Sequence, residues 1–356
     1  MLMARSLSFI FVLAFSMSLG LAEEFHSPPP SPFPARVCAP YVAAWTNVSI
    51  SEVARNTGNK FFTLAFILSN GSSNSDPYWN ASKPLTNNNY VTDLANLRAQ
   101  GGDVIISFGG EGGKELALVH TGVASLQAAY QKVITKYNLK WMDFDIEGAT
   151  IFDTAANTRR SKAIKNLQDA NPGLFIEYTV PSTSPNEGVT LPTLELLKNA
   201  MKHGVKIGLV NVMAMNYDRV LYCGDMGPYA VNVINHTHTQ LAGIKLDAPI
   251  GITPQIGVNS YPCEIFTLAN TQMVYDYAVA NPFVSLLSFW VMDADANYSN
   301  LEIFKKFNGP GSVNLKVLPS LPLQGGNPGR FDLSGRRIIP VEKQQSGRFR
   351  ISRPIP

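Results

Sequence analysis

The feature that most limits the possible folds is a repeated alternation of strand-like and helix-like segments. Eight runs of apolar, β-branched or aromatic residues follow one another over roughly 275 residues. Several of them are almost continuously apolar, which is typical of parallel strands covered on both faces. The eight runs are Val37–Trp45, Phe61–Leu68, Asp103–Gly110, Lys140–Glu147, Leu174–Pro181, Gly208–Asp218, Ala248–Asn259 and Leu286–Asp295.

The segments between these runs carry helix signals. Leu191–His203 has Pro192 in its first turn, apolar residues at helical spacing, and Gly204 directly after it. Ala124–Tyr137 repeats the apolar pattern, and Ser161–Ala170 is followed by an Asn-Pro-Gly stop. Strand followed by helix eight times predicts an α/β chain folded as a (β/α)8 TIM barrel. A doubly wound open sheet is less favoured because no Gly-rich nucleotide loop follows the first run.

The fourth run holds a row of acidic residues. Asp143, Asp145 and Glu147 alternate with Met142, Phe144 and Ile146, so a strand would place the carboxyls on one face and the apolar side chains on the other. Carboxyls this close repel one another when ionised, and at least one is expected to hold a proton near neutral pH, as a general acid must. A polar strand face washed by solvent is the less favoured interpretation.

Other candidate site residues also come at strand ends. The active site of a (β/α)8 enzyme lies at the C-terminal ends of its strands, and we expect Glu147 to be the last residue of the fourth. Ser107-Phe-Gly-Gly110 closes the third run, Met213-Ala-Met-Asn-Tyr-Asp218 the sixth, and Trp290 lies on the eighth. Taken alone, Trp290 and the methionines would more often be core residues, but their shared placement on one face favours a role in binding.

The chain has three cysteines, too few for a disulfide scaffold or a zinc site. Cys223 follows Asp218 by five residues and Cys263 follows Asn259 by four, so both are expected on adjacent loops of one rim and form our preferred disulfide. Cys38 begins the first run, on the opposite side, and is expected to be buried or free.

The segments outside the alternating pattern read as processing signals or linkers. Residues 1–22 resemble a secretory signal peptide, residues 23–35 a Pro-rich extended linker outside any core, and residues 311–356 a basic, disordered tail. The loop Asn70–Asn89 contains Tyr78 and Trp79, which could be either a platform for sugar rings or an anchor for the loop. Five glycosylation sequons fit a secreted glycoprotein; they begin at Asn47, Asn70, Asn80, Asn235 and Asn297.

Charge and hydropathy exclude several classes of protein. The net charge of +3 is misleading, since residues 323–356 carry seven basic residues against two acidic ones. Without that tail and Arg5 the rest of the chain is near −3, which does not suggest a nucleic-acid surface. No later segment has the uninterrupted apolar length of a membrane span. We therefore expect an exported protein outside the cell and outside the membrane.

At these motifs the chain resembles glycoside hydrolase family 18, the chitinase family. The family signature Asp-x-x-Asp-x-Asp-x-Glu is matched in its last three acidic positions by Asp143-Phe-Asp145-Ile-Glu147. The resemblance covers about residues 37–308, is closest to the bacterial-type members, and predicts a catalytic domain at residues 36–310. Lys140 replaces the first acidic residue of the signature, and its ammonium group could lower the pKa of Asp143. Further motif matches are Tyr41, Ser107-x-Gly109-Gly110, Met215-x-Tyr217-Asp218 and Trp290.

The resemblance implies hydrolysis of β-1,4-linked N-acetylglucosamine polymers with retention, in which the acetamido group of the substrate is the nucleophile. Glu147 would be the general acid and base, Asp145 would stabilise the acetamido group, Asp143 would share a proton with Asp145, and Tyr217 would position the acetamide. Binding residues carried over from the family are Trp290, Met215, Asp218, Gly110 and Tyr41.

The same resemblance implies an enzyme that acts on chitin or its oligosaccharides and needs no cofactor or metal. The signal peptide predicts that it is secreted, and we expect a monomer. An endo-β-N-acetylglucosaminidase acting on N-glycans uses the same machinery and remains an alternative. A catalytically silent, lectin-like chitin-binding protein is the second alternative, although the intact acidic row and Tyr217 weigh against it.

Overall fold

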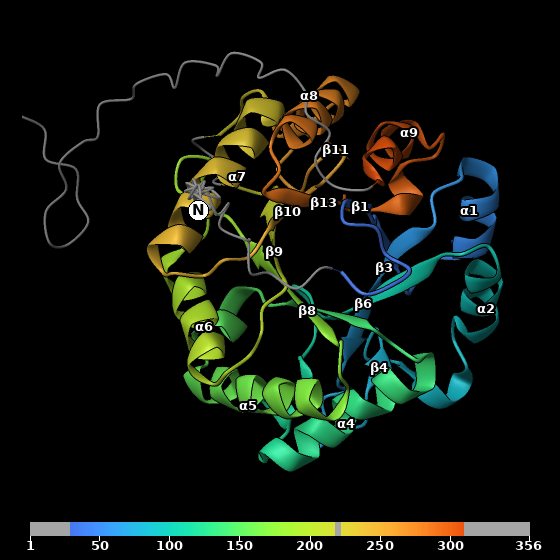
Figure 1. Ribbon diagram of the computed structural model, residues 1–356, viewed down its shortest axis with the longest axis vertical. Coiled ribbons are helices and arrows are strands. Elements are labelled where there is room, and N and C mark those ends of the chain that lie inside the picture. Colours follow the sequence, from blue (N-terminus) through green and yellow to red (C-terminus); the bar gives the residue numbers. More distant parts are fainter. Residues whose placement is uncertain (1–28, 218–221, 310–356) are drawn as a thin grey trace, which may run out of the picture. The chain divides into compact units, whose positions relative to one another are not determined.

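Eight of the nine parallel strands in the described part of the computed structural model lie within the predicted runs, whereas the eighth run, predicted at Leu286–Asp295, is misplaced because its strand begins at Val284 and ends at Leu287. The structure describes residues 29–217 and 222–309, and Figure 1 shows the strands surrounded by helices. The parallel strands are β1 (Val37–Cys38), β2 (Tyr41–Ala43), β3 (Phe61–Leu68), β6 (Asp103–Gly109), β7 (Trp141–Asp145), β8 (Phe175–Pro181), β9 (Leu209–Ala214), β10 (Ile250–Pro254) and β13 (Val284–Leu287).

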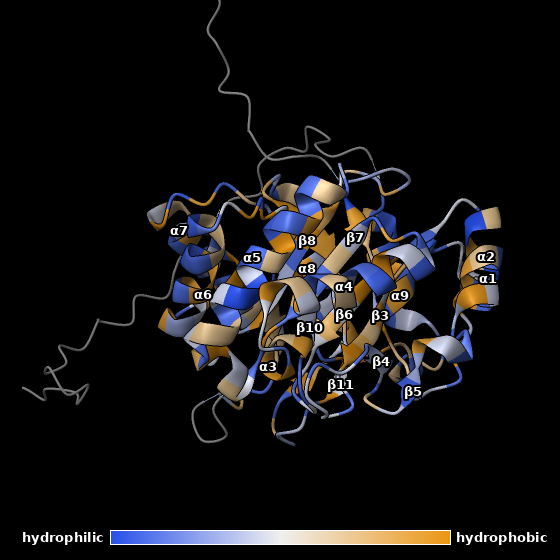
Figure 2. Cartoon of the chain, turned by 90° about the horizontal axis from the view of Figure 1, so that it is seen from below, coloured by the Kyte–Doolittle hydropathy of each residue, from blue (hydrophilic) through white to orange (hydrophobic). Residues whose placement is uncertain are grey.

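A helix follows each strand position around the sheet. In Figure 2 apolar residues concentrate along the strands, whereas the surrounding helices carry both apolar and polar residues. These helices are α1 (Ile50–Thr57), α2 (Val91–Ala99), α4 (Val123–Tyr137), α5 (Thr154–Ala170), α6 (Leu191–Lys202), α7 (Met226–Gly243), α8 (Leu268–Ala280) and α9 (Ser299–Phe304). Helix α5 begins seven residues before the predicted Ser161 because Asp153 caps it, accepting a hydrogen bond from the Ala156 amide at 2.8 Å.

The strand order confirms the predicted (β/α)8 arrangement. It runs β1-β13-β10-β9-β8-β7-β6-β3, and β2 also pairs with β3. The first strand is divided at Ala39-Pro40, so β1 pairs in parallel with β13 and β2 with β3. Pro40 has no amide proton to donate, and its carbonyl accepts from the Thr63 amide at 3.0 Å. The hydrogen-bonded sheet is therefore not closed into a full ring: it is open between β1 and β2, the two halves of the first strand.

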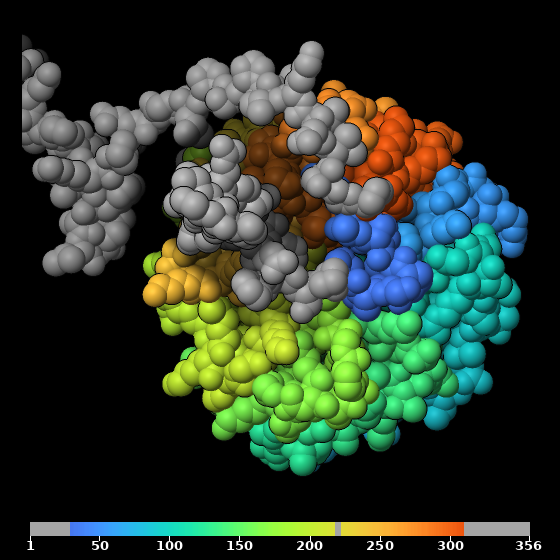
Figure 3. All heavy atoms as spheres, viewed as in Figure 1, coloured from blue at the N-terminus to red at the C-terminus, as the bar shows by residue number. Residues whose placement is uncertain are grey.

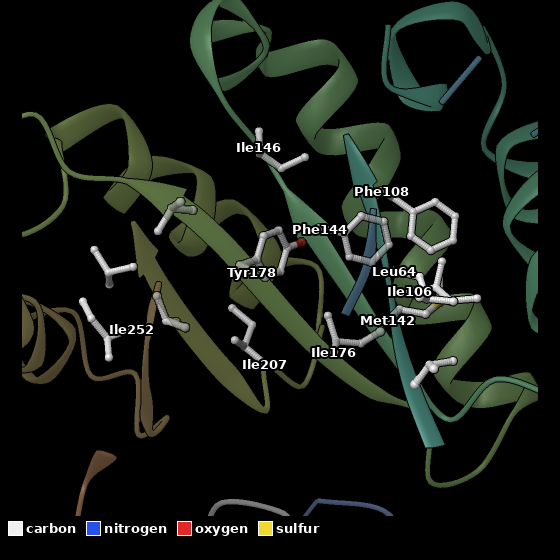
Figure 4. Packing of buried hydrophobic residues seen from close by; sticks show 14 of the residues in the cluster. Leu64, Ile106, Phe108, Met142, Phe144, Ile146, Ile176, Tyr178, Ile207 and Ile252 are labelled. Carbon is white, nitrogen blue, oxygen red and sulfur yellow. The ribbon is translucent and has the colours of Figure 1, made fainter. Parts of the chain in front are cut away.

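Side chains on the helix-facing side of the strands form the larger core. Met142 and Phe144 point to this side from β7, together with Ile146 directly after that strand, Phe108 from β6 and Tyr178 from β8 (Figure 4). All five are buried, and the Phe108 and Phe144 rings stack with centroids 5.4 Å apart. The predicted alternation along the fourth strand is confirmed, and it leaves Asp143 and Asp145 to face the interior of the barrel.

A smaller core fills the N-terminal end of the barrel. Trp141 and Phe175 pack there with Phe33, whose ring centroid lies 4.9 Å from that of Trp141. The expectation that residues 23–35 stay outside any core is therefore wrong for Phe33, which is buried. Figure 3 shows the dark-blue start of the described chain on this face, within the ring of helices. The expected extended backbone is also wrong at residues 31–33, which form a turn in which the Phe33 amide donates to the Pro30 carbonyl at 2.9 Å.

The loop after β3 is anchored by its tryptophan. Tyr78–Trp79 forms β4, which pairs antiparallel with β3 and with β5 (Lys83–Pro84). Trp79 is fully buried, and its indole N–H donates to the hydroxyl of Tyr137 at 2.8 Å. Trp79 is thus an anchor and does not present a ring to a ligand.

Within the described ranges no helix has the length and apolarity needed to cross a membrane.

Candidate active site

The acidic row, defined as Asp143, Asp145 and Glu147, begins inside the barrel and ends on its C-terminal rim. β7 ends at Asp145, so the expectation that Glu147 is the last strand residue is wrong by two positions. The Ile146 amide still donates to the Thr179 carbonyl of β8 at 3.0 Å, after which the chain turns at Gly148 into the short 3-10 helix η2 (Gly148–Phe152). Glu147 occupies the N-cap position of that helix without a capping hydrogen bond from its side chain, and it is only partly buried.

Asp143 is held by three hydroxyl groups from three other strands. Its Oδ2 accepts from the Tyr41 hydroxyl at 2.9 Å and from Ser107 at 2.6 Å, and its Oδ1 accepts from Thr179 at 2.8 Å. Complete burial raises the pKa of Asp143 to about 6, although the three hydroxyl bonds favour the ionised form. Tyr41 therefore belongs to the support of the acidic row.

Asp145 and Glu147 form a carboxyl pair above Asp143. Burial, followed by the charges of Glu147 and Asp143, holds the pKa of Asp145 well above its usual range. Burial, together with the charges of Glu111 and Asp143, raises the pKa of Glu147 to about 7, although a hydrogen bond with Asp145 opposes the rise. The row therefore keeps at least one proton near neutral pH, in agreement with the sequence-based expectation.

Two glycines allow the third strand to approach the row closely. The Gly110 amide donates to the Asp145 carbonyl at 2.9 Å. A Cβ on Gly109 would lie 2.1 Å from that carbonyl oxygen, and one on Gly110 would lie 2.7 Å from the Phe66 ring. Both glycines also have positive φ values, of 111° and 88°. Gly110, predicted as a binding residue, supports the backbone at Asp145 through its main chain.

Tyr217 lies at the C-terminal end of the sixth strand position with its hydroxyl unpaired. The side chain is buried, and among the described residues its Oη has no hydrogen-bond partner. Its amide donates to the carboxylate of Glu264 at 2.8 Å, and the other carboxylate oxygen accepts from the Asn259 side chain at 3.1 Å. Burial and the charge of Glu264 raise the pKa of Tyr217, which keeps the phenol neutral. Met215 is partly buried beside it.

Aromatic rings form a wall at the end of the eighth strand position. The Trp290 ring stacks on Phe66, with centroids 5.6 Å apart and planes 15° apart, and lies 5.8 Å from Tyr41. Trp45 lies 6.0 Å from Trp290 and is half exposed, at 50% of its surface. Trp290 is only partly buried, so one side of this wall is available to a ligand.

The predicted disulfide and free cysteine are both found. Cys223 and Cys263 are bonded, with their sulfurs 2.03 Å apart, and link the loops that follow β9 and β10. Cys38 is free and buried in β1. Because Glu264 adjoins Cys263, the disulfide lies next to the carboxylate that holds the Tyr217 amide. Asp218, another predicted binding residue, lies outside the described residues.

The expectation that Lys140 acts on Asp143 is wrong. Lys140 is exposed at the N-terminal end of β7, where its Nζ donates to the Ser31 carbonyl at 3.1 Å. The start of β7 lies at the end of the barrel opposite the C-terminal rim that carries Glu147. In the described part of the chain, no ion pair includes a member of the acidic row, and no acidic, His or Cys cluster could hold a metal ion.

Sequence reasoning missed four residues of this region. Thr179 and Glu177 alternate inward on β8, Glu264 follows the second cysteine of the disulfide, and Trp45 ends the first predicted run. The alternation of Glu177 and Thr179 with apolar neighbours was a usable signal, since it has the same period as the fourth strand. Nothing in the local sequence marks Glu264 as a partner of Tyr217, because that contact depends on the loops meeting.

Comparison with known sequences finds chitinases. No family model matches the chain. It is 32% identical over 267 residues to a probable bifunctional chitinase/lysozyme of Escherichia coli and 31% identical over 267 residues to endochitinase 11 of Metarhizium anisopliae. Each alignment covers 69% of this chain but only 29% and 50% of the two relatives, so the chain spans at most half the length of these curated relatives.

Comparison with solved structures finds the same class over most of a domain. The catalytic domain of a hyperthermophilic chitinase from Pyrococcus furiosus is 33% identical, with a TM-score of 0.66, and the match covers 74% of this chain and 86% of that one. Catalytic-site mutants of its active domain 2, solved with chito-oligosaccharides, match at 32% identity and the same TM-score of 0.66. This shared fold and identity show that the chain belongs to glycoside hydrolase family 18, the chitinase family.

Proposed function

We propose that the protein is a secreted chitinase that hydrolyses β-1,4-linked N-acetylglucosamine by the substrate-assisted retaining mechanism. The observation that carries this proposal is the pair Asp145 and Glu147, two hydrogen-bonded carboxyls whose pKa values are raised at a barrel rim. Two buried polar atoms, Asp145 Oδ1 and Tyr217 Oη, have no partner among the described residues. A buried acceptor and a buried donor at one rim suit the N–H and the carbonyl oxygen of an acetamido group.

The first step breaks the glycosidic bond. With a pKa of about 7, Glu147 is largely protonated in slightly acidic solution and can give its proton to the glycosidic oxygen as the bond to the anomeric carbon breaks. The acetamido carbonyl oxygen of the same sugar closes onto that carbon and forms an oxazolinium ion. Asp145 accepts a hydrogen bond from the acetamido N–H and stabilises the positive charge, while Tyr217, whose phenol is neutral, donates to the acetamide.

The second step restores the sugar and the enzyme. Water attacks the anomeric carbon from the side the leaving group vacated, its proton passes to Glu147, and the ring of the oxazolinium opens to the acetamide. Two displacements at one carbon give retention. Asp143 takes part by exchanging a proton with Asp145, and its three hydroxyl donors hold its carboxyl group in position. Trp290 forms the floor under the reacting sugar, and Met215 shapes the neighbouring wall.

The test is hydrolysis of a soluble N-acetylglucosamine oligomer by the purified protein and by Glu147→Gln. We expect the parent to turn over with first formation of the β-anomer, and the variant to lose about 10²–10⁴-fold in turnover with KM little changed, because only the proton donor is removed. Fully deacetylated oligomers should not be cut. Equal cleavage of acetylated and deacetylated oligomers would contradict the substrate-assisted mechanism.

The same experiment separates the alternatives. Release of N-glycans from a glycoprotein, without cleavage of chitin oligomers, would instead indicate an endo-β-N-acetylglucosaminidase. Tight binding of oligomers by both proteins without turnover would indicate a lectin-like protein. Export through residues 1–22 and a monomeric state are part of the proposal, and N-terminal sequencing of the exported protein and light scattering test them.

A further inference from the structure

A row of buried polar side chains crosses three neighbouring strands and ends at Asp143. Thr179 lies on β8, Asn211 on β9 and Thr253 on β10, and these strands are adjacent in the sheet. All three side chains are buried, and Thr179 and Asn211 are register partners. Polar groups in a dry interior are costly unless they are hydrogen-bonded. Two of the three, Asn211 and Thr253, have no role in the mechanism above.

Hydrogen bonds link these side chains from one strand to the next. The Thr253 hydroxyl donates to Asn211 Oδ1 at 3.0 Å, and Asn211 Nδ2 donates to Thr179 Oγ1 at 3.0 Å. The Thr179 hydroxyl then donates to Asp143 Oδ1 at 2.8 Å. We call Thr253, Asn211 and Thr179 the interior relay. Each of its donors points towards Asp143.

The amide of Asn211 limits where the Thr179 hydroxyl proton can point. A threonine hydroxyl has one proton and two lone pairs, whereas an amide nitrogen can only donate. The Asn211 N–H therefore occupies one lone pair of Thr179 Oγ1. The proton is left with two acceptors, Asp143 Oδ1 at 2.8 Å and the Tyr41 oxygen at 3.0 Å. An ionised carboxylate is the stronger acceptor and is also the nearer one, so the proton lies on Asp143.

The oxygen of the same amide would have the opposite effect on Thr179. If the Asn211 amide were turned over, its Oδ1 would face Thr179 and compete with Asp143 for the hydroxyl proton. The Thr253 hydroxyl satisfies this oxygen on the far side. Without Thr253 the oxygen would be a buried acceptor without a donor, and it would be drawn to the Thr179 proton.

We propose that Asn211 is a positioning residue that holds the Thr179 hydroxyl with its proton on Asp143. Thr253 keeps the Asn211 amide in the orientation that this requires. The inference rests on the proposed function in one respect, the exchange of a proton between Asp143 and Asp145. A hydrogen bond to an ionised carboxyl favours the ionised form, so the interior relay stabilises Asp143 as an anion and leaves the shared proton with Asp145.

The charges around Asp143 do not come from the interior relay. The titratable groups that face it are Asp145 and Glu147 from its own segment, Glu177 from β8 and Tyr41 from β2. Within the described residues none of these acids forms an ion pair. Replacing Asn211 or Thr253 leaves all these groups in place, so a change in the titration of Asp143 reports the relay.

Titration of the Asp143 carboxyl tests the proposal without relying on turnover. In protein labelled with ¹³C at the aspartate carboxyl carbons, its resonance is the one missing from Asp143→Asn. We expect the midpoint to rise by about 0.5–1 pH unit in Asn211→Leu, which is similar in size but cannot donate. It should rise by a smaller amount in the isosteric Thr253→Val. The matched control, Thr63→Val, removes a buried hydroxyl that donates to the Ala39 carbonyl, and it should leave the midpoint unchanged.

Kinetics on a soluble N-acetylglucosamine oligomer give the second readout. For Asn211→Leu we expect kcat to fall about three- to tenfold with KM within about twofold. The acid limb of the pH–rate profile should move to higher pH, because Asp143 takes up a proton more readily. Thr63→Val should match the parent at every pH.

The titration separates failure of this inference from failure of the proposed function. A midpoint equal to that of the parent in both Asn211→Leu and Thr253→Val overturns the inference, even if oligomers are cut as expected. An equal rise in Thr63→Val also overturns it, as does an unchanged kcat and pH profile in Asn211→Leu. A raised midpoint in a protein that cuts no oligomer supports the relay and counts against the proposed hydrolase. If Asn211→Leu does not fold, an unchanged midpoint in Thr253→Val alone overturns the inference.

Discussion

The acidic row should make the protein less stable as pH rises, and Glu147→Gln should remove part of that loss. Folding raises the pKa of Glu147 from its ordinary 4.5 to about 7. A group with a raised folded-state pKa contributes stability that is fully present below its unfolded pKa and is lost as pH rises through the folded one. The window for Glu147 is therefore from about pH 4.5 to about pH 7.

The size of the effect follows from the same two values. At 1.36 kcal/mol for each pH unit between them, the parent loses up to about 3 kcal/mol across this window. Glutamine has nearly the same shape as a protonated glutamate and cannot ionise. We therefore expect Glu147→Gln to be about as stable as the parent at pH 4.5 and up to about 3 kcal/mol more stable at pH 8.

Urea unfolding at pH 4.5 and at pH 8 measures the difference directly, with the disulfide intact in all samples. A matched control is Glu195→Gln, which removes an exposed carboxyl on α6 that forms an ion pair with Lys198. The control should follow the parent at both pH values. The reasoning is refuted if the Glu147→Gln variant shows the same loss of stability between the two pH values as the parent, or is less stable at pH 8.

Four further outcomes are expected. Glu264→Leu should lower kcat about tenfold, because the Tyr217 amide loses its carboxylate partner, and steady-state kinetics beside circular dichroism would show whether the fold survives. Trp79→Ala should cost about 3–5 kcal/mol in urea unfolding because the ring is fully buried. Trp45→Ala should leave stability almost unchanged and raise KM for long oligomers, since the ring is half exposed beside the aromatic wall. Phe33→Ala should also cost about 3–5 kcal/mol without changing kcat, because it lies in the core at the opposite end of the barrel.

Much of the fold was predictable because it depends on patterns of apolar and polar residues that are short in range along the sequence. The alternation of Asp143 and Asp145 with Met142 and Phe144 has the two-residue period of a strand, and that period alone assigns the acids to one face. The eight runs and the helix signals between them fixed the order of elements. Once parallel strands form a ring, their C-terminal ends must share one rim, so the pairing of Cys223 with Cys263 could also be expected.

Contacts between distant segments needed the tertiary structure. Phe33 enters the barrel from a Pro-rich segment, and Lys140 points out of it at the end far from the acids. The sequence around Glu177 shows a strand but not that this carboxyl is the register partner of Asp143. Register depends on how two strands separated by a whole helix are aligned, and hydrophobic periodicity within either strand does not specify it.

The sequence by itself determined the class of fold, the acidic row and the family to which the row belongs, because each is a local arrangement of residue types. The tertiary structure alone decided which groups surround that row. Three hydroxyls from three strands meet on Asp143, and no ion pair reaches the row in the described residues. The protonation of buried acids depends on such neighbours and on the exclusion of water, and both arise only when strands far apart in sequence close around the same interior.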